Sequence, residues 1–201
     1  MGSYKHIQET FQKEFSGKKD KGFDYKAIQR DRLIEFRKEK SAVVRIEKPT
    51  NIARAHKLGY KAKKGFIIVR ARIRKGSGLH RRPVSGRRPK RMGVNKLTRR
   101  LNIQAMAEQR ASRKYPNCEV LNSYYIGDDG QSHYFEIILV DTHAPEIASD
   151  KEINWICEKQ HKGRAFRGLT SRGKKSRGLR WKGKGAENAR PSLRANKRHA
   201  K

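Results

Sequence analysis

The sequence has few cysteines and no long hydrophobic run. Its two cysteines, Cys118 and Cys157, stand 39 positions apart and form no CxxC pair, which argues against a disulfide framework and a zinc site. The longest apolar runs, 66–69 and 137–140, fall far short of the roughly 18 residues that a membrane-spanning helix needs. The N-terminal residues lack the apolar region of a secretory signal, so we expect a cytosolic protein.

Acidic side chains are also scarce, and they are unevenly placed. The 201 residues contain 51 Lys and Arg against 19 Asp and Glu, a formal net charge of +32. Residues 48–107 carry 19 basic side chains and no acidic one, and residues 159–201 carry 16 basic side chains and one acidic one. Residues 108–158 have 10 acidic and 4 basic side chains. Long stretches of one sign are typical of interaction arms, so the pattern predicts a polyanionic partner.

The hydrophobic patterning that is present predicts an α+β fold around a modest core. Residues 3–15, 23–40 and 51–57 have helical features, and Asn95 is a candidate cap for a helix over 96–112. Residues 65–74, 119–126 and 133–140 have strand features, and the last two are predicted to form a hairpin. We therefore expect a small sheet built from strand, helix and β-hairpin, packed with helices.

Composition divides the chain into three predicted parts. The first is a helical N-terminal region, 1–61, and the second is the α+β core, 62–158, which contains a basic loop at 75–93. The third is a basic tail, 159–201, rich in Gly, Arg and Lys. The loop and the tail have too few apolar residues to fold on themselves, so we expect both to stay mobile until they bind a partner.

The strand over 65–74 alternates with period two. Ile67, Val69, Ala71 and Ile73 share one face, which we expect to be buried. The other face carries three arginines, and we expect it to point outward towards RNA; it comprises Phe66, Ile68, Arg70, Arg72 and Arg74. An ordinary solvent-facing strand is the alternative interpretation.

The tail repeats the tripeptide Arg-Gly-Leu at 167–169 and 177–179. Glycine lets the backbone approach a ligand closely, and arginine can bind phosphate with two parallel hydrogen bonds. Phe166 and Trp181 are candidates for stacking on bases. A plain disordered tail is the alternative.

Two motif matches in the sequence fail at the positions that decide them. Residues 168–174 match GxxxxGK, but Lys175 follows where a P-loop needs Ser or Thr, and no apolar strand precedes it. Residues 64–71 partly match the RNA-binding signature of the RRM domain, but Ile68 and Ala71 stand where aromatic side chains should stack on bases. Neither the histidines nor the acidic residues form a catalytic constellation, so we expect no enzymatic activity and no cofactor or metal.

Ordered segments across most of the chain resemble one family, the archaeal and eukaryotic large-subunit ribosomal protein fifteen, which is distinct from the bacterial protein of that number. The matching segments are GYKAKKG at 59–65, GVN at 93–95, AEQRA at 107–111, VLNSY at 120–124, EIILVD at 136–141 and FRGLT at 166–170. The tail resembles archaeal members through KGKG at 182–185 and RPSLR at 190–194. Thr142 departs from the proline that much of the family has after the aspartate.

The resemblance implies a structural constituent of the large ribosomal subunit, located in the cytoplasm, that supports translation. It implies an α+β domain whose basic extensions thread between helices of large-subunit ribosomal RNA (rRNA), with neighbouring ribosomal proteins as further partners and no homo-oligomer. A chromatin-type DNA-binding protein is the alternative function, although no DNA-reading motif is present. The basic stretches supply the candidate RNA-binding residues: Lys61, Lys63, Lys64, Arg70, Arg72, Arg74, Lys75, Arg81, Arg82, Arg87, Arg88, Lys90, Arg91, Arg99, Arg100, Arg164, Arg167, Arg172, Lys174, Lys175, Arg177, Arg180, Trp181, Lys182 and Lys184.

Overall fold

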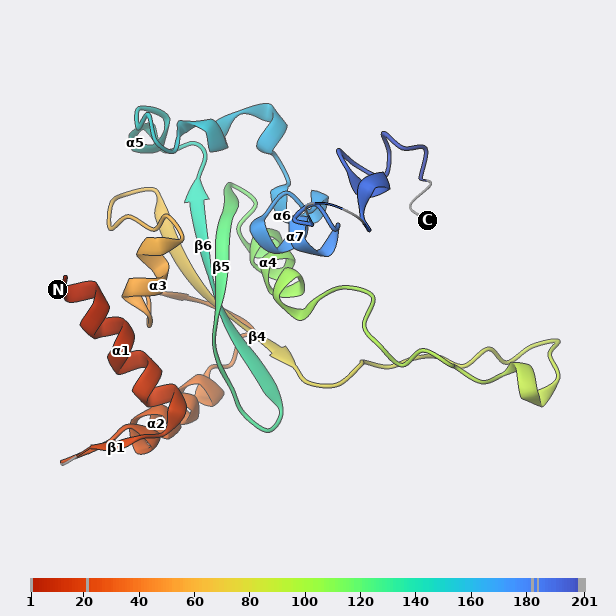
Figure 1. Cartoon of the computed structure of the whole chain (residues 1–201), viewed down its shortest axis with the longest axis horizontal. Helices are drawn as coiled ribbons and strands as arrows, with labels where there is room; N and C mark the ends of the chain where they lie inside the picture. Colours follow the sequence, from red (N-terminus) through yellow and green to blue (C-terminus); the bar gives the residue numbers. More distant parts are fainter. Residues whose placement is uncertain (1, 21, 182, 184, 199–201) are drawn as a thin grey trace.

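A four-stranded antiparallel sheet with strand order β3-β4-β6-β5 organises the chain (Figure 1). The computed structural model describes residues 2–20, 22–181, 183 and 185–198. The strands are β3 (Val43–Ile46), β4 (Phe66–Arg74), β5 (Cys118–Asp128) and β6 (Ser132–Asp141). The predicted α+β class and the predicted strands β4, β5 and β6 are confirmed, whereas β3 was not predicted.

The predicted β5–β6 hairpin turns through the sequence Gly-Asp-Asp-Gly at 127–130. The Asp129 carboxylate accepts hydrogen bonds from the backbone N–H groups of Gln131 and Ser132, both at 2.7 Å. These bonds favour the turn conformation. Beyond β6, the Thr142 N–H and hydroxyl both donate to the Asn117 carbonyl, at 3.4 and 3.2 Å. A proline at this position could not make the first of these bonds.

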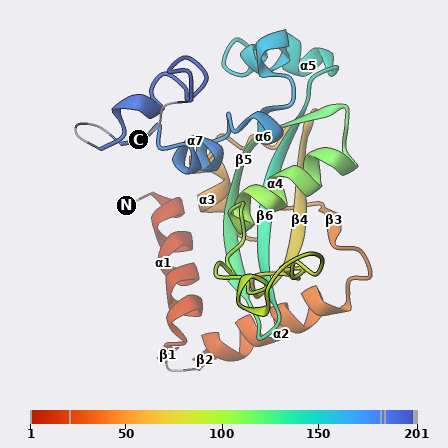
Figure 2. The same ribbon diagram turned by 90° about the vertical axis from the view of Figure 1, so that its right-hand side faces the viewer.

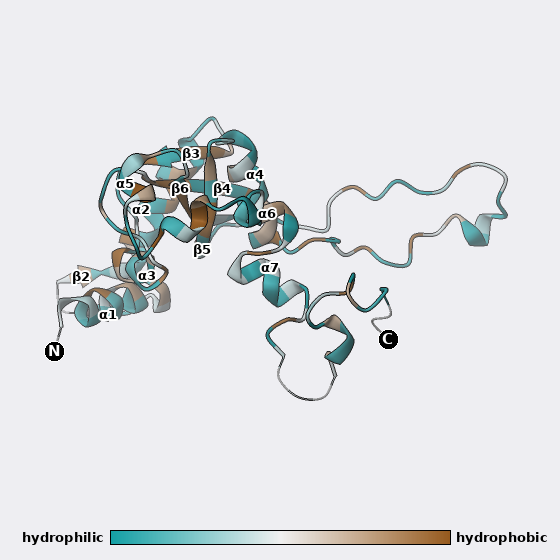
Figure 3. Cartoon of the chain, turned by 90° about the horizontal axis from the view of Figure 1, so that it is seen from above, coloured by the Kyte–Doolittle hydropathy of each residue, from teal (hydrophilic) through white to brown (hydrophobic). Residues whose placement is uncertain are grey.

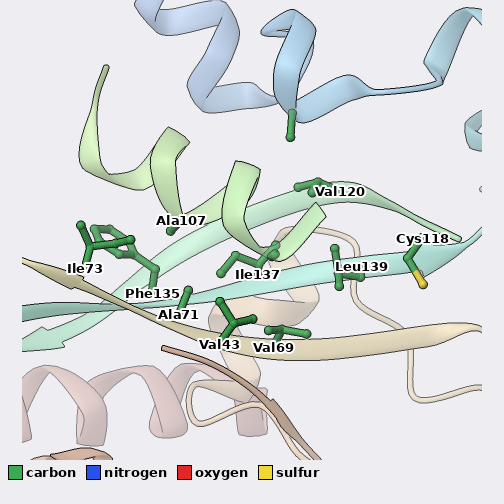
Figure 4. Close-up of a cluster of buried hydrophobic side chains, with 12 residues drawn as sticks. Val43, Val69, Ala71, Ile73, Ala107, Cys118, Val120, Phe135, Ile137 and Leu139 are labelled. Carbon is green, nitrogen blue, oxygen red and sulfur yellow. The ribbon is translucent and has the colours of Figure 1, made fainter. Parts of the chain in front are cut away.

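Helix α4 (Ile103–Lys114) covers one face of the sheet. Figure 4 shows Val69, Ala71 and Ile73 of β4 beneath this helix, together with side chains of β5 and β6. The buried face predicted for β4 is therefore confirmed: Val69, Ala71 and Ile73 are fully buried, and Ile67 is partly buried against the same cluster.

The opposite face of the sheet is also covered, by α1 (Ser3–Ser16), α2 (Tyr25–Lys38) and α3 (Ile52–Lys57), as Figure 2 shows from the side. Phe36 of α2 and Ala55 of α3 pack there on Ile68 and Ile138. A short hairpin of β1 (Lys19–Asp20) and β2 (Phe23–Asp24) connects α1 to α2. The three predicted N-terminal helices are confirmed, but the second face of β4 is not open to solvent as predicted.

The helix predicted over 96–112 begins later than expected. Asn102, and not Asn95, caps α4, because its side chain accepts a hydrogen bond from the Gln104 N–H. Residues before Asn102 instead form the returning limb of a long excursion over residues 75–102, which we call the arm (Figures 1 and 3). The arm contains one short 3-10 turn, η1 (Pro89–Arg91).

The part of the chain after β6 forms short helical pieces. These are α5 (Pro145–Ala148), η2 (Asn154–Cys157), η3 (Lys159–His161), α6 (Arg164–Arg167), α7 (Ser171–Ser176) and η4 (Glu187–Ala189). Each Arg-Gly-Leu tripeptide lies at the C-terminal end of a helix: 167–169 at the end of α6 and 177–179 at the end of α7. Gly168 and Gly178 adopt left-handed φ of 66° and 72°, and the next leucine N–H bonds back to Arg164 O and Lys174 O respectively. The repeat is therefore a recurring helix C-cap, in which left-handed glycine is favoured.

The first half of the tail packs on the folded body and does not project from it. Thr170 is fully buried, and its hydroxyl donates to the Glu108 carboxylate of α4 at 2.7 Å. The backbone of Gly173 lies against that of Gly168 so closely that a Cβ there would come within 2.5 Å of the Gly168 Cα. The expectation of a tail without its own packing is therefore wrong for residues 163–177.

The buried Glu108 carboxylate should make stability depend on pH. Burial raises its pKa above the ordinary 4.5, so the folded protein holds this proton more tightly than the unfolded chain. The stability that this group contributes is present below pH 4.5 and is lost as the pH rises through the folded-state pKa. Relative to Glu108→Gln, the wild-type free energy of unfolding should therefore decline from pH 4.5 towards neutrality. Urea titrations of both proteins measure this difference, and parallel pH profiles would contradict it.

Candidate nucleic-acid interface

The root of the arm forms where β4 extends past the strand beside it. Strand β3 pairs only with residues 68–71 of β4, and the Arg72 N–H bonds to Ala42 O at 2.8 Å just beyond it. Arg99, on the returning limb, donates hydrogen bonds to the carbonyls of Arg74 and Gly76 on the outgoing limb. Arg99 therefore joins the two limbs of the arm, and its guanidinium is engaged by protein and not free for RNA as predicted.

Replacing Arg99 by Ala should loosen the root of the arm. The substitution leaves backbone carbonyls without a charged donor, and such bonds contribute about 1.5–3 kcal/mol each. Amide exchange over residues 74–78 should then accelerate by roughly tenfold or more. Arg100→Ala is the matched control, because Arg100 is exposed and makes no side-chain hydrogen bond to the described residues. Equal exchange rates in the two variants would show that Arg99 does not hold the arm.

A broad groove opens between the arm, β4 and α4. Its volume is about 1660 Å³, and none of its described lining residues is acidic. The basic side chains that line it come from all three elements: Arg72, Arg74, Lys75, Arg81, Lys96, Arg99, Arg100, Arg110 and Arg113. We call this the arginine groove. Such a concentration of one charge attracts a polyanion and raises its local concentration.

Two arginines of the arginine groove were missed by the sequence interpretation. Arg110 and Arg113 stand three residues apart on α4, on the exposed side of the helix away from Ala107 and Ala111. Arg110 also donates to Arg72 O at 3.3 Å. The helical spacing was the signal that could have revealed them, but only the fold shows that this helix face turns towards the arm.

Arg70 does not point into solvent as predicted. Its side chain is only 13% exposed, its guanidinium lies 3.8 Å from the ring centroid of Phe36, and it pairs with Glu39. Arg72 is partly buried and donates to Arg37 O at 3.4 Å, while Arg74 is exposed. The predicted outward arginine face of β4 is therefore wrong at Arg70 and is limited to the end of the strand. The cause is the layer formed by α2, which covers the rest of that face.

Two of the candidate lysines are also engaged within the protein. Lys61 and Lys63 both pair with Asp150 in the segment after α5, and Lys61 also pairs with Glu152. The Lys63 hydrogen bond is the main reason that the pKa of Asp150 lies well below its ordinary range. Their neighbour Lys64 is exposed. The two lysines thus hold the loop before β4 to the segment after β6.

In the tail, Arg164 is buried and belongs to the core. Its Nε donates to Val120 O at 3.0 Å, and its guanidinium lies over the Trp155 ring. Burial lowers the pKa of this arginine, but the carboxylates of Glu119 and Glu108 act in the opposite direction. The prediction that Arg164 faces RNA does not fit this burial.

The other tail candidates fall into three groups. Arg167, Arg177 and Arg180 are held by hydrogen bonds to Gln160 and Lys162, to Gly168, and to Ser171 respectively. Arg172 is partly buried, and its Nε has no hydrogen-bond partner among the described residues. Lys174, Lys175 and Trp181 are exposed, and Lys182 and Lys184 lie outside the described residues.

The remaining candidate RNA-binding residues of the arm are accessible to solvent. The side chains of Arg81, Arg82, Arg87, Arg88, Lys90 and Arg91 are exposed. Two apolar side chains of the arm, Leu79 and Val84, are also exposed, at 100% and 61%. An extended segment of this kind buries too little apolar surface to hold its own shape and is suited to contact with a partner.

Comparison with known protein families adds an independent finding. A family model described as Ribosomal L15, of the archaeal and eukaryotic type, matches residues 2–196. The chain belongs to this family. Ribosomal L15 proteins of this type are structural components of the large ribosomal subunit and are located in the cytoplasmic ribosome. The match confirms the resemblance and favours the ribosomal interpretation over the chromatin-type alternative.

The Ribosomal L15 family is a structural and non-enzymatic class. Within the described ranges, no group of histidine, cysteine or acidic side chains is arranged to hold a metal ion. No helix among the described residues is long and apolar enough to cross a membrane.

Proposed function

We propose that this chain binds large-subunit rRNA through the arginine groove and the arm, and so stabilises the folded rRNA of the subunit. The observation that carries the proposal is the groove itself: side chains from the arm, β4 and α4 line it, and none of the described ones is acidic. Arginine suits this role because its planar guanidinium binds phosphate oxygens in pairs. Neighbouring large-subunit proteins are the further partners proposed.

The roles that we propose for the three parts of the chain follow from the distribution of charge among them. Residues 62–158 supply the scaffold, with its basic loop at 75–93, and the basic tail 159–201 adds a second RNA contact. Within the helical region 1–61, residues 1–47 carry 12 basic and 8 acidic side chains, so the attraction of this part for a polyanion is weak. Its strand β3 nevertheless completes the core sheet. The division into three parts stays a prediction.

Charge reversal in the arginine groove tests the proposal. The double variant Arg74→Glu, Arg100→Glu changes two exposed side chains that line the groove. Because two phosphate contacts are replaced by repulsion, affinity for a large-subunit rRNA fragment should fall by at least about tenfold. Filter binding or electrophoretic mobility measures the change.

The matched control is Lys26→Glu, Arg30→Glu on α2. It alters the net charge equally and also changes exposed side chains. This control should retain most of the affinity, because α2 does not line the groove. Equal losses in both double variants would mean that the protein responds to net charge alone, and the groove would not be the site.

A further inference from the structure

Trp181 is exposed in a way that the packing of the chain does not explain. It is 64% exposed, the highest value for any aromatic side chain in the described ranges. The other tryptophan, Trp155, lies 4.8 Å below the Arg164 guanidinium, and its indole N–H donates to Glu152 O. No described residue accepts a hydrogen bond from the Trp181 indole. A large aromatic ring with its face open to solvent is suited to stacking on a planar ligand.

The backbone that carries Trp181 is nevertheless fixed. The preceding turn is closed by Gly178, with φ of 72°, and by the bond from the Leu179 N–H to Lys174 O at 3.1 Å. Arg190, from further along the tail, donates to the Trp181 carbonyl and to Gly183 O. The ring is thus left exposed on a backbone that is held from both sides.

This turn is attached to the folded body and not to a free tail. Helix α7 precedes it, and Thr170 caps that helix through the Gly173 N–H at 3.1 Å while also binding Glu108 of α4. Trp181 therefore has a defined position relative to α4, whose Arg110 and Arg113 line the arginine groove. A rigidly placed aromatic ring loses little conformational entropy when a ligand stacks on it.

The charge around the ring selects the class of ligand. The exposed cationic side chains of Lys174, Lys175 and Arg180 precede the ring in the sequence, and Glu187 is the only acidic residue in 159–201. We propose that Trp181 is a stacking site for an unpaired nucleobase of rRNA, with the phosphates on either side of that base neutralised by the surrounding cations. This inference rests on the proposed function and deepens it, since it specifies a non-duplex RNA element as ligand of the tail.

Tryptophan fluorescence tests the proposal directly. In a Trp155→Phe background, Trp181 is the only tryptophan, because the chain has two. Single-stranded oligoadenylate should quench its emission, and an RNA duplex of equal length should quench it much less. If Trp155→Phe does not fold, as circular dichroism would show, the difference in quenching between wild type and Trp181→Phe gives the same information.

Affinity and salt dependence separate stacking from electrostatic contact. Trp181→Ala should weaken binding to oligoadenylate by about 5- to 100-fold, whereas Trp181→Phe should restore most of the loss. Because a stacked ring releases no counterions, the slope of log affinity against log salt should be the same for Trp181→Ala and wild type. A reduced slope would mean that the substitution has displaced the cationic tail, and would overturn the proposal.

The failure of this inference would be distinct from failure of the proposed function. If Trp181 is not quenched while the protein still binds rRNA in a way that Arg74→Glu, Arg100→Glu impairs, then the groove binds RNA and the tryptophan does not stack. Equal quenching by single strand and duplex would also overturn the proposal, because paired bases offer no free face to an inserted ring.

Discussion

The affinity of the free protein for a large-subunit rRNA fragment should fall by about three to five orders of magnitude between roughly 50 and 200 mM monovalent salt. Each neutralised phosphate contributes about 0.7–0.9 to the slope of log affinity against log salt. The arginine groove and the arm together present more than enough exposed cations for about ten such contacts. Filter binding across a salt series measures the slope.

Intact large subunits should behave differently in the same salt series. A projecting arm enclosed between RNA helices cannot leave unless the RNA moves, so the protein should stay bound at salt concentrations that release it from the free fragment. Sedimentation of washed subunits followed by protein analysis provides the measurement. If the protein is removed from intact subunits as easily as from the fragment, it binds at the surface, and the proposed role of the arm is incorrect.

Replacing Val69 by Asp should abolish folding. Val69 is fully buried on β4 beneath α4, in the hydrophobic cluster between the sheet and that helix. An unpaired carboxylate in such a site costs several kcal/mol, which is comparable with the whole stability of an ordinary domain, about 5–15 kcal/mol. Far-UV circular dichroism should show loss of the native spectrum.

Lys64→Asp is the control for this substitution, since Lys64 is exposed a few residues before β4. It should keep the native spectrum and unfold cooperatively. A folded Val69→Asp protein with unchanged stability would contradict the assignment of β4 to the core, and with it the position of the groove that β4 helps to line.

The strands with regular alternation were predictable from the sequence, because each has a face that must be buried. Strand β3 was not, since its four residues carry no pattern of their own and are extended only because they pair with β4. The start of α4 was misplaced because Asn95 and Asn102 are both acceptable caps. The tertiary structure decides between the two caps, because residues 92–101 run back along the arm and leave Asn102 as the start of the helix.

The electrostatic site was predictable in outline and not in detail. The long stretches of basic residues with almost no acidic ones identified the arm and the tail. They could not show which arginines are bound by other parts of the protein. Arg70, Arg99 and Arg164 look like RNA ligands in the sequence, yet each binds a partner that is 23 or more residues away. Phe66 and Ile68, on the same face as Arg70, were the local signs that part of this face is covered.

Crosslinking of the protein to rRNA within purified large subunits tests the central claim most directly. Ultraviolet irradiation followed by mass spectrometry identifies the peptides joined to nucleotides. The crosslinked peptides should fall mainly in the arm, residues 75–102, with further ones from α4 and the tail. Crosslinks confined to α1 and α2, with none from the arm, would contradict the assignment of the arginine groove as the rRNA-binding site.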